Sequence, residues 1–231
     1  MREYIVIGGF LFNNTPLDFI LEKLNNVRFI DINILDKIDT LEDILQQVHE
    51  IVLNVPDSSK ISLIGYSMGG LIALKYANDY PEYIDKIVLI NSSPNFLEND
   101  TWQGIKPQEF NRLVKRLDTM HLDEFKRYFT QLVAHPQQIN IENYATYFNN
   151  ALNKSKLLIL LKIMKTTNFT DIISKYNLSN LQHKLLMIYS QHDILVPWNK
   201  LNAHQVMLLN STHLELQQHS ELLTEILQDI C

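Results

Sequence analysis

Cysteine is almost absent from this sequence, and so are long hydrophobic runs. The single cysteine is Cys231, so the chain cannot form an internal disulfide. No apolar run approaches the ~18 to 20 residues that a membrane-spanning helix needs. The N-terminal stretch MREYIVIGGF turns after about five apolar residues, too few for the apolar region of a signal peptide. We therefore expect a cytoplasmic protein that does not associate with membranes.

The chain also lacks an excess of positive charge. Its formal net charge is −6 over 231 residues, which argues against nucleic acid as the main partner. The segment 94–165 differs, because it carries ten Lys/Arg and only seven Asp/Glu. Hydrophobic residues make up 46% of the chain, a content that suits one large globular core.

Short apolar runs alternate with helical patterns over the first 94 residues. Strands are expected at about 4–7, 27–35, 61–67 and 85–93, and helices at about 15–24, 40–54 and 68–80. Thr40 and Asp43 are spaced as the capping box of the second helix. Because the strands are continuously apolar, they indicate a parallel sheet covered on both faces.

Residues 95–166 interrupt this alternation with helical spacing alone, and two strands, 184–190 and 204–209, and a helix, 220–231, follow. The pattern predicts an α/β fold with a mostly parallel sheet of about six strands flanked by helices. We expect a core formed by 1–94 and 167–231. Residues 95–166 would form a helical lid, inserted after the fourth strand, over the sheet edge where ligands bind in such folds.

Glycine is scarce as well, yet three of the six glycines fall in the stretch LIGYSMGG at 63–70. Residues 65–69 fit the pattern G-x-S-x-G between an expected strand and an expected helix, which is the context of a nucleophile elbow. The turn would strain Ser67 and lift its hydroxyl above the sheet. Side chains at 65 and 69 would strike neighbouring elements, so glycine is required there. The alternative is a tight turn with an incidental serine.

A serine nucleophile needs a base and an acid, which in this fold follow it along the chain in the order acid, then histidine. Asp193 comes directly after the strand 184–190, and His213 follows the last expected strand. We expect these two residues to complete the triad. Among the eight histidines, His219 is the main rival of His213, and the alternative for Asp193 is a simple turn aspartate.

The pair Gly8-Gly9 follows the first strand, where such a fold supplies one backbone donor for an oxyanion hole. The second donor comes from the residue after the nucleophile. We therefore expect the N–H groups of Phe10 and Met68 to form the oxyanion hole. The alternative is a plain glycine turn.

These motifs resemble those of the α/β-hydrolase superfamily along the whole chain. The stretch SSPNFLENDTWQGIKP at 92–107 is similar to the start of the lid in the biotin-synthesis esterases that cleave pimeloyl-[acyl-carrier protein] methyl ester. LDEFKRYF at 122–129 resembles a lid helix of that family, and YSQHDILVP at 189–197 resembles its acid loop. The lid motif is more specific than G-x-S-x-G, because most α/β-hydrolases have unrelated lids.

The resemblance implies a serine carboxylesterase of biotin synthesis that needs no metal or organic cofactor. We also expect the chain to be a monomer. Arg127 matches an arginine with which the family contacts acyl-carrier protein, and we add Lys126 to the expected docking surface. Tyr66, Phe129 and Leu132 are the expected substrate-binding side chains. The alternatives are another small lidded hydrolase, such as a thioesterase or a menaquinone-pathway C–C lyase, and a catalytically inactive binding module. For any single lysine, a solvated surface position is the alternative.

The sequence also departs from the family. Gly8-Gly9-Phe10-Leu11 stands where the family has His-Gly-Trp-Gly, so the histidine that supports the oxyanion loop is missing. Gln131 occupies the place of a second lid arginine. Only 20 positions separate Asp193 from His213, which predicts a very short helix between the last two strands.

Overall fold

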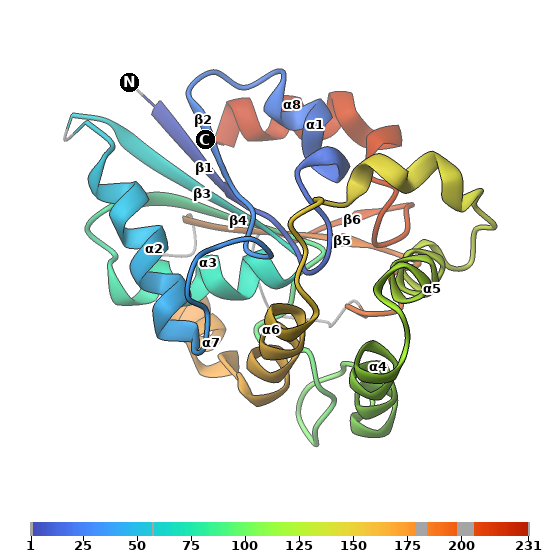
Figure 1. Cartoon of the computed structure of the whole chain (residues 1–231). Coiled ribbons are helices and arrows are strands. Elements are labelled where there is room, and N and C mark those ends of the chain that lie inside the picture. Colours follow the sequence, from blue (N-terminus) through green and yellow to red (C-terminus); the bar gives the residue numbers. More distant parts are fainter. Residues whose placement is uncertain (1, 57, 179–183, 198–205, 231) are drawn as a thin grey trace.

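A six-stranded sheet forms the centre of the computed structural model, which describes residues 2–56, 58–178, 184–197 and 206–230 (Figure 1). The strand order is β2-β1-β3-β4-β5-β6, and every neighbouring pair is parallel. The strands are β1 Arg2–Ile7, β2 Val27–Ile30, β3 Lys60–Tyr66, β4 Ile84–Ile90, β5 Leu185–Ser190 and β6 Val206–Leu209. The predicted parallel sheet of about six strands is confirmed.

Helices connect these strands. The α-helices are α1 Asp18–Leu21, α2 Leu41–Leu53, α3 Met68–Asp79, α4 Pro107–Thr119, α5 Leu122–Ala134, α6 Lys154–Thr166, α7 Thr170–Leu178 and α8 Ser220–Ile230. Shorter 3-10 helices are η1 Thr15–Leu17, η2 Ile141–Tyr147 and η4 Gln217–His219. The capping box of Thr40 and Asp43 at the start of α2 is confirmed.

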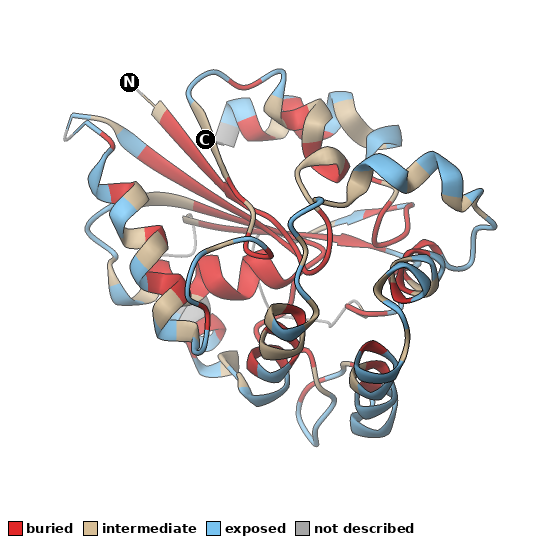
Figure 2. Ribbon diagram, in the orientation of Figure 1, coloured by how far each residue is buried: buried red, intermediate tan, exposed pale blue. Residues whose placement is uncertain are grey.

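The sheet is buried on both faces, as continuous apolar strands require. One core cluster packs α2 and α3 against one face, and a second packs α1 and α8 against the other. In Figure 2 the central strands and α3 are almost entirely buried, whereas the outer helices are buried only along their inner sides. The molecule therefore has the three layers of a doubly covered sheet.

Register brings the carboxyl ends of the strands to one edge. Ile7 of β1 pairs with Gly65 of β3, Tyr66 pairs with Ile90 of β4, and Ile90 pairs with Ile188 of β5. The turns that follow these strands consequently meet at the same edge. Residues 8–12, Ser67, Asn91, 191–193 and 210–213 all lie there, which places the predicted site residues of the core together.

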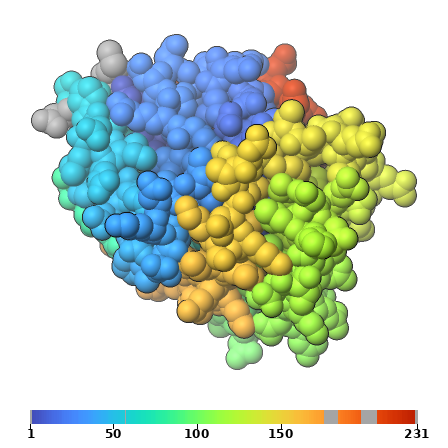
Figure 3. Space-filling view, in the orientation of Figure 1, coloured from blue at the N-terminus to red at the C-terminus, as the bar shows by residue number. Residues whose placement is uncertain are grey.

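Helices α4, α5, η2 and α6 lie between β4 and β5 in the chain, where the helical insertion was predicted. We call residues 95–166 the insert. In Figure 3 its helices, green to gold, form a continuous surface against the blue N-terminal part. Its apolar side belongs to the same core cluster as α2 and α3, because Phe110, Phe125, Phe129 and Leu160 are buried in that cluster. The assignment of 95–166 as a separate lid stays a prediction.

Several elements differ from the expectation. The first turn of the insert is not helical: Leu97 pairs with Ile105 and Asn99 with Trp102 as isolated β-bridges, and α4 begins only at Pro107. The helix expected at 15–24 is shorter, with η1 and α1 ending at Leu21. Helix α7 was not predicted. The short helix expected between the last two strands falls largely on 198–205, outside the described residues.

Candidate active site

Ser67 occupies a sharp turn between β3 and α3. Its backbone angles are φ 53° and ψ −124°, a region that residues other than glycine rarely adopt. Such strain persists only where the surroundings fix it, and it is typical of a nucleophile elbow. Ser67 is only 6% exposed, so the expected hydroxyl standing clear of the sheet is instead covered by neighbouring segments.

The glycines around Ser67 permit close backbone contacts. A Cβ atom on Gly69 would lie 2.2 Å from the carbonyl oxygen of Ile7 and 2.5 Å from that of Gly8. A Cβ atom on Gly65 would lie 2.3 Å from the Cα of Gly70. Both distances are far below contact, so the start of α3 can reach β1 and β3 only without these side chains. The steric reason predicted for glycine at these two positions therefore holds.

Ser67, His213 and Asp193 form one hydrogen-bonded line. His213 Nε2 lies 2.9 Å from Ser67 Oγ, and His213 Nδ1 lies 2.6 Å from Asp193 Oδ2. Because an ionised carboxylate only accepts, it fixes the proton on Nδ1, which leaves Nε2 free to accept from the serine hydroxyl. The imidazole side chain is 2% exposed and the carboxylate 0%. This is the geometry in which a histidine can take the proton of a serine.

The Asp193 carboxylate is held from its other side as well. Its Oδ1 accepts from the N–H groups of Leu195 at 2.8 Å and Val196 at 2.9 Å. The turn is joined to the histidine loop, because His192 N–H donates to the Ser211 carbonyl at 3.0 Å. Asp193 is thus both a turn aspartate and the partner of His213, so the two readings of this residue are compatible.

Two buried side chains fix the backbone of His213. The hydroxyl of Tyr66 donates to the His213 carbonyl at 2.8 Å, and Nδ2 of Asn91 donates to the same oxygen at 3.0 Å. Burial raises the pKa of Tyr66 well above its usual value, so this hydroxyl stays a donor. The ring of Tyr66 also lies 5.4 Å from the imidazole, centroid to centroid. Tyr66 therefore holds the histidine loop, while its expected contact with substrate stays a prediction.

The competing histidines lie elsewhere. His219 Nε2 is 3.2 Å from the Asn210 carbonyl, and His192 Nε2 is 3.1 Å from Asn210 Oδ1. Both contacts are exposed. Neither ring faces Ser67, which favours His213 as its partner.

The loop after β1 lies against the elbow. A Cβ atom on Gly9 would come within 3.0 Å of Ser67 Cβ, so the backbone of this loop runs directly beside the serine. Neither Phe10 N–H nor Met68 N–H has a hydrogen-bond partner among the described residues. Met68 is the first residue of α3, where an amide has no partner within the helix. Both expected oxyanion donors are thus unpaired next to Ser67.

Aromatic side chains of the insert cover this loop. The Phe10 ring meets the Phe129 ring edge-on at 5.3 Å between centroids and the Phe125 ring at 6.4 Å. Phe10 is 3% and Phe129 4% exposed. Leu132 is half-buried and packs against the same cluster. Helix α5 therefore contacts the site through the side chain of Phe10, the residue whose N–H is an expected oxyanion donor.

The two expected docking residues differ in their surroundings. Lys126 pairs with Asp123 at 3.0 Å on the same helix and lies 5.5 Å from the Phe148 ring. The side chain of Arg127 is exposed and forms no hydrogen bond or ion pair among the described residues, although its charge, after the hydrogen bond and charge of Lys126, helps to lower the pKa of Asp123. Other basic side chains of the insert serve internal contacts: Arg116 lies over the Tyr128 ring, and Lys156 donates to the Leu35 carbonyl. Arg127 is therefore the freer of the two.

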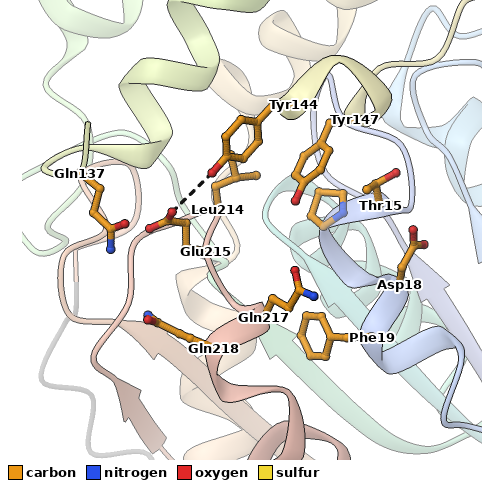
Figure 4. Close-up of a pocket in the computed structure, with 11 residues that line it drawn as sticks. Thr15, Asp18, Phe19, Gln137, Tyr144, Tyr147, Leu214, Glu215, Gln217 and Gln218 are labelled. Carbon is orange, nitrogen blue, oxygen red and sulfur yellow. Dashed lines mark hydrogen bonds between the residues drawn. The ribbon is translucent and has the colours of Figure 1, made fainter. Parts of the chain in front are cut away.

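A cavity of about 350 Å³ opens where the insert meets the core beside the His213 loop (Figure 4). Gln137, Tyr144 and Tyr147 line it from the insert, and Leu214, Glu215, Gln217 and Gln218 from the segment after His213; Thr15, Pro16, Asp18 and Phe19 complete the lining. Tyr144 donates to Glu215 across this seam at 3.4 Å. Burial, and to a smaller extent the negative charge of the nearby Glu215, raise the pKa of Tyr144 to about 12.

Among the described residues, no group of three or more His, Cys, Asp or Glu side chains is placed to hold a metal ion. No helix within the described part of the chain has the length and apolar content to cross a bilayer.

Sequence reasoning missed two polar residues of the site. Asn91 follows β4 and adopts a φ of 45°, and Asn33 follows β2; both are 0% exposed. The available signal is a polar residue at the end of an apolar parallel-strand run, because that end falls at the edge where the site forms. Asn33 and Asn91 were instead included in the strands expected at 27–35 and 85–93, whereas β2 ends at Ile30 and β4 at Ile90. Their partners could not be found in this way, since each bonds to loops far away in sequence.

Comparison with known proteins identifies the family of this chain. The family model described as alpha/beta hydrolase fold matches residues 22–215. Proteins called pimeloyl-[acyl-carrier protein] methyl ester esterase are similar to the chain. The one from Aliivibrio fischeri is 26% identical over 77% of this chain and 68% of its own length. The one from Aliivibrio salmonicida is 26% identical over 94% and 84%. The one from Vibrio vulnificus is 28% identical over 68% of this chain and 60% of its own length, so less than two thirds of that relative is matched.

Solved structures agree on the fold. An esterase from Exiguobacterium antarcticum superposes with a TM-score of 0.81 at 16% identity, over 99% of this chain and 91% of that one. An enol-lactonase from Burkholderia xenovorans gives a TM-score of 0.74 at 13% identity, over 100% and 91%. With the family model covering most of the sequence, the chain belongs to the α/β-hydrolase family.

Proposed function

We propose that this chain is a serine carboxylesterase that hydrolyses the methyl ester of pimeloyl-[acyl-carrier protein]. The observation that carries the chemistry is the line from Ser67 through His213 to Asp193, with distances of 2.9 and 2.6 Å at the carboxyl edge of the sheet. The choice of substrate rests on the lid motif at 92–107 and on the name shared by the relatives. No metal or organic cofactor takes part in the proposed reaction.

The first half-reaction forms an acyl-enzyme. His213 Nε2 takes the proton of Ser67 as Oγ attacks the carbonyl carbon of the methyl ester, and the carbonyl oxygen becomes an oxyanion. Asp193 holds the imidazole in the required tautomer and stabilises its positive charge. When the tetrahedral intermediate collapses, the C–O bond to the methoxy group breaks. His213 returns its proton to that oxygen, and methanol leaves.

The N–H groups of Phe10 and Met68 are the proposed donors to the oxyanion. Both are unpaired in the described structure, so they need not break another bond to serve the transition state. Losing one such donor typically costs about 3 kcal/mol of transition-state stabilisation. In the second half-reaction His213 activates water, which attacks the acyl-enzyme. The products are the free carboxylic acid on its carrier and the regenerated serine.

The insert acts as a lid in this proposal. Ser67 and His213 are 6% and 2% exposed, so substrate reaches them only after the covering segments move apart. The seam beside the cavity of Figure 4 is held by a few contacts, including the Asn13 N–H to Tyr147 carbonyl bond at 2.8 Å. We place substrate entry along this seam. Phe129 and Leu132 then lie over the apolar part of the acyl chain, with Tyr66 behind the serine.

Arg127, assisted by Lys126, is the proposed docking point for the carrier protein. Carrier proteins are acidic beside their prosthetic group, and the insert is the net-positive part of this acidic chain. Exposed charges of this kind act mainly on the rate of encounter. Because Lys126 is already paired with Asp123, Arg127 should contribute more.

Three experiments test the proposal at different depths. Turnover of p-nitrophenyl butyrate by the wild type, lost in Ser67→Ala, supports an esterase, whereas no turnover favours the inactive binding module. Incubation of the enzyme with purified pimeloyl-[acyl-carrier protein] methyl ester, with the products identified by mass spectrometry, tests the substrate assignment. Rapid release of methanol with the carrier still attached supports the assignment. Faster cleavage of the thioester would favour a thioesterase, and activity only on a menaquinone-pathway intermediate would favour the C–C lyase. Complementation of a biotin-auxotrophic strain that lacks its own esterase tests the role in cells.

A further inference from the structure

Asn33 is a fully buried side chain that reaches from the end of β2 to the loop after β1. Its Oδ1 accepts from Leu11 N–H at 2.7 Å, and its Nδ2 lies 3.0 Å from both the Gly9 and the Phe12 carbonyl oxygens. Asp31 Oδ1 lies 2.8 Å from the same nitrogen and accepts the Asn33 N–H at 2.9 Å. One primary amide therefore contacts three residues of the loop, and its two Nδ2 hydrogens are shared among the Gly9, Phe12 and Asp31 oxygens.

These contacts enclose Phe10, whose N–H is the proposed oxyanion donor. Gly9 precedes it, Leu11 and Phe12 follow it, and all three are tied to Asn33. Leu11 has a φ of 74°, a strained value for a leucine, so the bend needs external support. Gly9 lies against Ser67, since a Cβ atom there would come within 3.0 Å of the serine Cβ. A small shift of this loop would therefore turn the Phe10 N–H away from the reacting carbonyl.

We propose that Asn33, oriented by Asp31, is the positioning residue of the oxyanion loop. The inference rests on the proposed esterase function. In this chain the loop reads Gly8-Gly9-Phe10-Leu11 and contains no polar side chain of its own. Its shape is instead set from the neighbouring strand by a side-chain amide that offers both an acceptor and donors. An apolar residue at position 33 would leave the Leu11 N–H and two loop carbonyls without this partner.

A purely structural role is the competing explanation, and Asn95 provides a matched control for it. Asn95 is a 5% exposed amide that also fixes a loop, accepting from Leu97 N–H at 3.2 Å and donating to the Leu97 carbonyl at 2.8 Å. Its loop lies at the start of the insert and supplies no proposed catalytic group. Replacing either asparagine by alanine removes a buried amide, but only position 33 acts on the oxyanion loop.

The experiment compares Asn33→Ala and Asn95→Ala with the wild type on p-nitrophenyl butyrate, measuring kcat, KM and Tm. Misplacing a donor impairs the transition state more than substrate binding, so Asn33→Ala should lower kcat about 10- to 100-fold with KM changed less than about threefold. Asn95→Ala should keep kcat within about threefold even where its Tm falls equally. Asn33→Ser, which keeps a donor and an acceptor, should recover part of kcat.

Each other outcome is decisive. Wild-type protein that does not turn over the ester would remove the esterase proposal and this role with it. If the wild type is active and folded Asn33→Ala keeps its kcat, or loses no more than Asn95→Ala, Asn33 only supports the fold. The same conclusion follows if neither variant at position 33 folds at 25 °C while Asn95→Ala does.

Discussion

At the scale of single residues, the site depends on side chains with few alternative partners. Ser67 Oγ meets one base, and His213 meets Ser67 on one nitrogen and Asp193 on the other. The backbone of His213 is then fixed by Tyr66 and Asn91. The order serine, aspartate, histidine and the positions of the strand ends were enough to predict the three residues of this hydrogen-bonded line. The supporting bonds were not predictable, because Tyr66 and Asn91 lie 147 and 122 positions from His213 and meet it only after the sheet has formed.

Replacing Ser67 by alanine is expected to abolish ester hydrolysis while the protein stays folded. The change removes one oxygen and leaves the strained backbone unaltered, so Tm should move by no more than about 3 °C. Activity should fall at least about a thousandfold, because no other group can form the acyl-enzyme. Steady-state assays beside thermal denaturation check both parts. A folded variant that retains a tenth of the wild-type rate would show that Ser67 is not the nucleophile.

His213→Ala should cost about as much activity as Ser67→Ala, since triad members act as a unit. His219→Ala serves as the control, because that ring contacts the Asn210 carbonyl and not the serine. Removing His213 also leaves Asp193 Oδ2 buried without its partner, so a loss of stability is expected as well. Comparing His213→Gln, which keeps a polar group there, separates folding from catalysis. Asp193→Ala should cost somewhat less than His213→Ala. Greater damage from His219→Ala would reassign the base.

At the scale of elements, periodicity predicted the sheet better than the connections. All six strands overlap the expected runs, with differences at their ends, because buried parallel strands are continuously apolar. Helix α7 escaped prediction since its pattern is short, and its apolar Ile172 and Ile173 are recognisable as core only once α3 lies beside them. The bridges between 97 and 105 escaped because each involves single residue pairs instead of an alternating strand. Such local pairings depend on tertiary packing more than on propensity.

The contact between α3 and β1 leads to a prediction about Gly69. In Gly69→Ala the new methyl would lie 2.2 Å from the Ile7 carbonyl oxygen, so α3 must shift away from the strand that carries the oxyanion loop. We expect a Tm lower by several degrees and, in the protein that remains folded, an esterase kcat reduced by at least about tenfold. Asn78→Ala, on the partly exposed side of α3, is the control and should change little. Wild-type activity and stability in Gly69→Ala would mean that the elbow tolerates displacement.

At the scale of the whole molecule, charge is divided between an acidic core and a net-positive insert. The sequence predicted this division, but not which charges are free. Lys126, Lys154 and Lys156 form internal contacts, which the structure alone could reveal. Arg112, Lys115 and Arg127 remain exposed on α4 and α5. A carrier-docking surface would therefore be centred on these two helices and not spread over the entire insert.

Reversing one charge on this surface tests the carrier hypothesis. Arg127→Glu should lower kcat/KM for the carrier-bound ester several-fold, and added salt should lower the wild-type value, because steering between exposed charges is screened. Hydrolysis of p-nitrophenyl butyrate should hardly change, since a small ester needs no docking.

Lys126→Glu should act more weakly on docking but disturb α5, because it also breaks the pair with Asp123. Lys60→Glu is the matched control: it makes the same charge change at the exposed start of β3, the opposite end of the strand from Ser67. If Arg127→Glu and Lys60→Glu lower kcat/KM for the carrier-bound ester equally, the effect comes from the net charge of the protein and not from docking at Arg127. Equal losses on both substrates in Arg127→Glu would mean that Arg127 only maintains the insert.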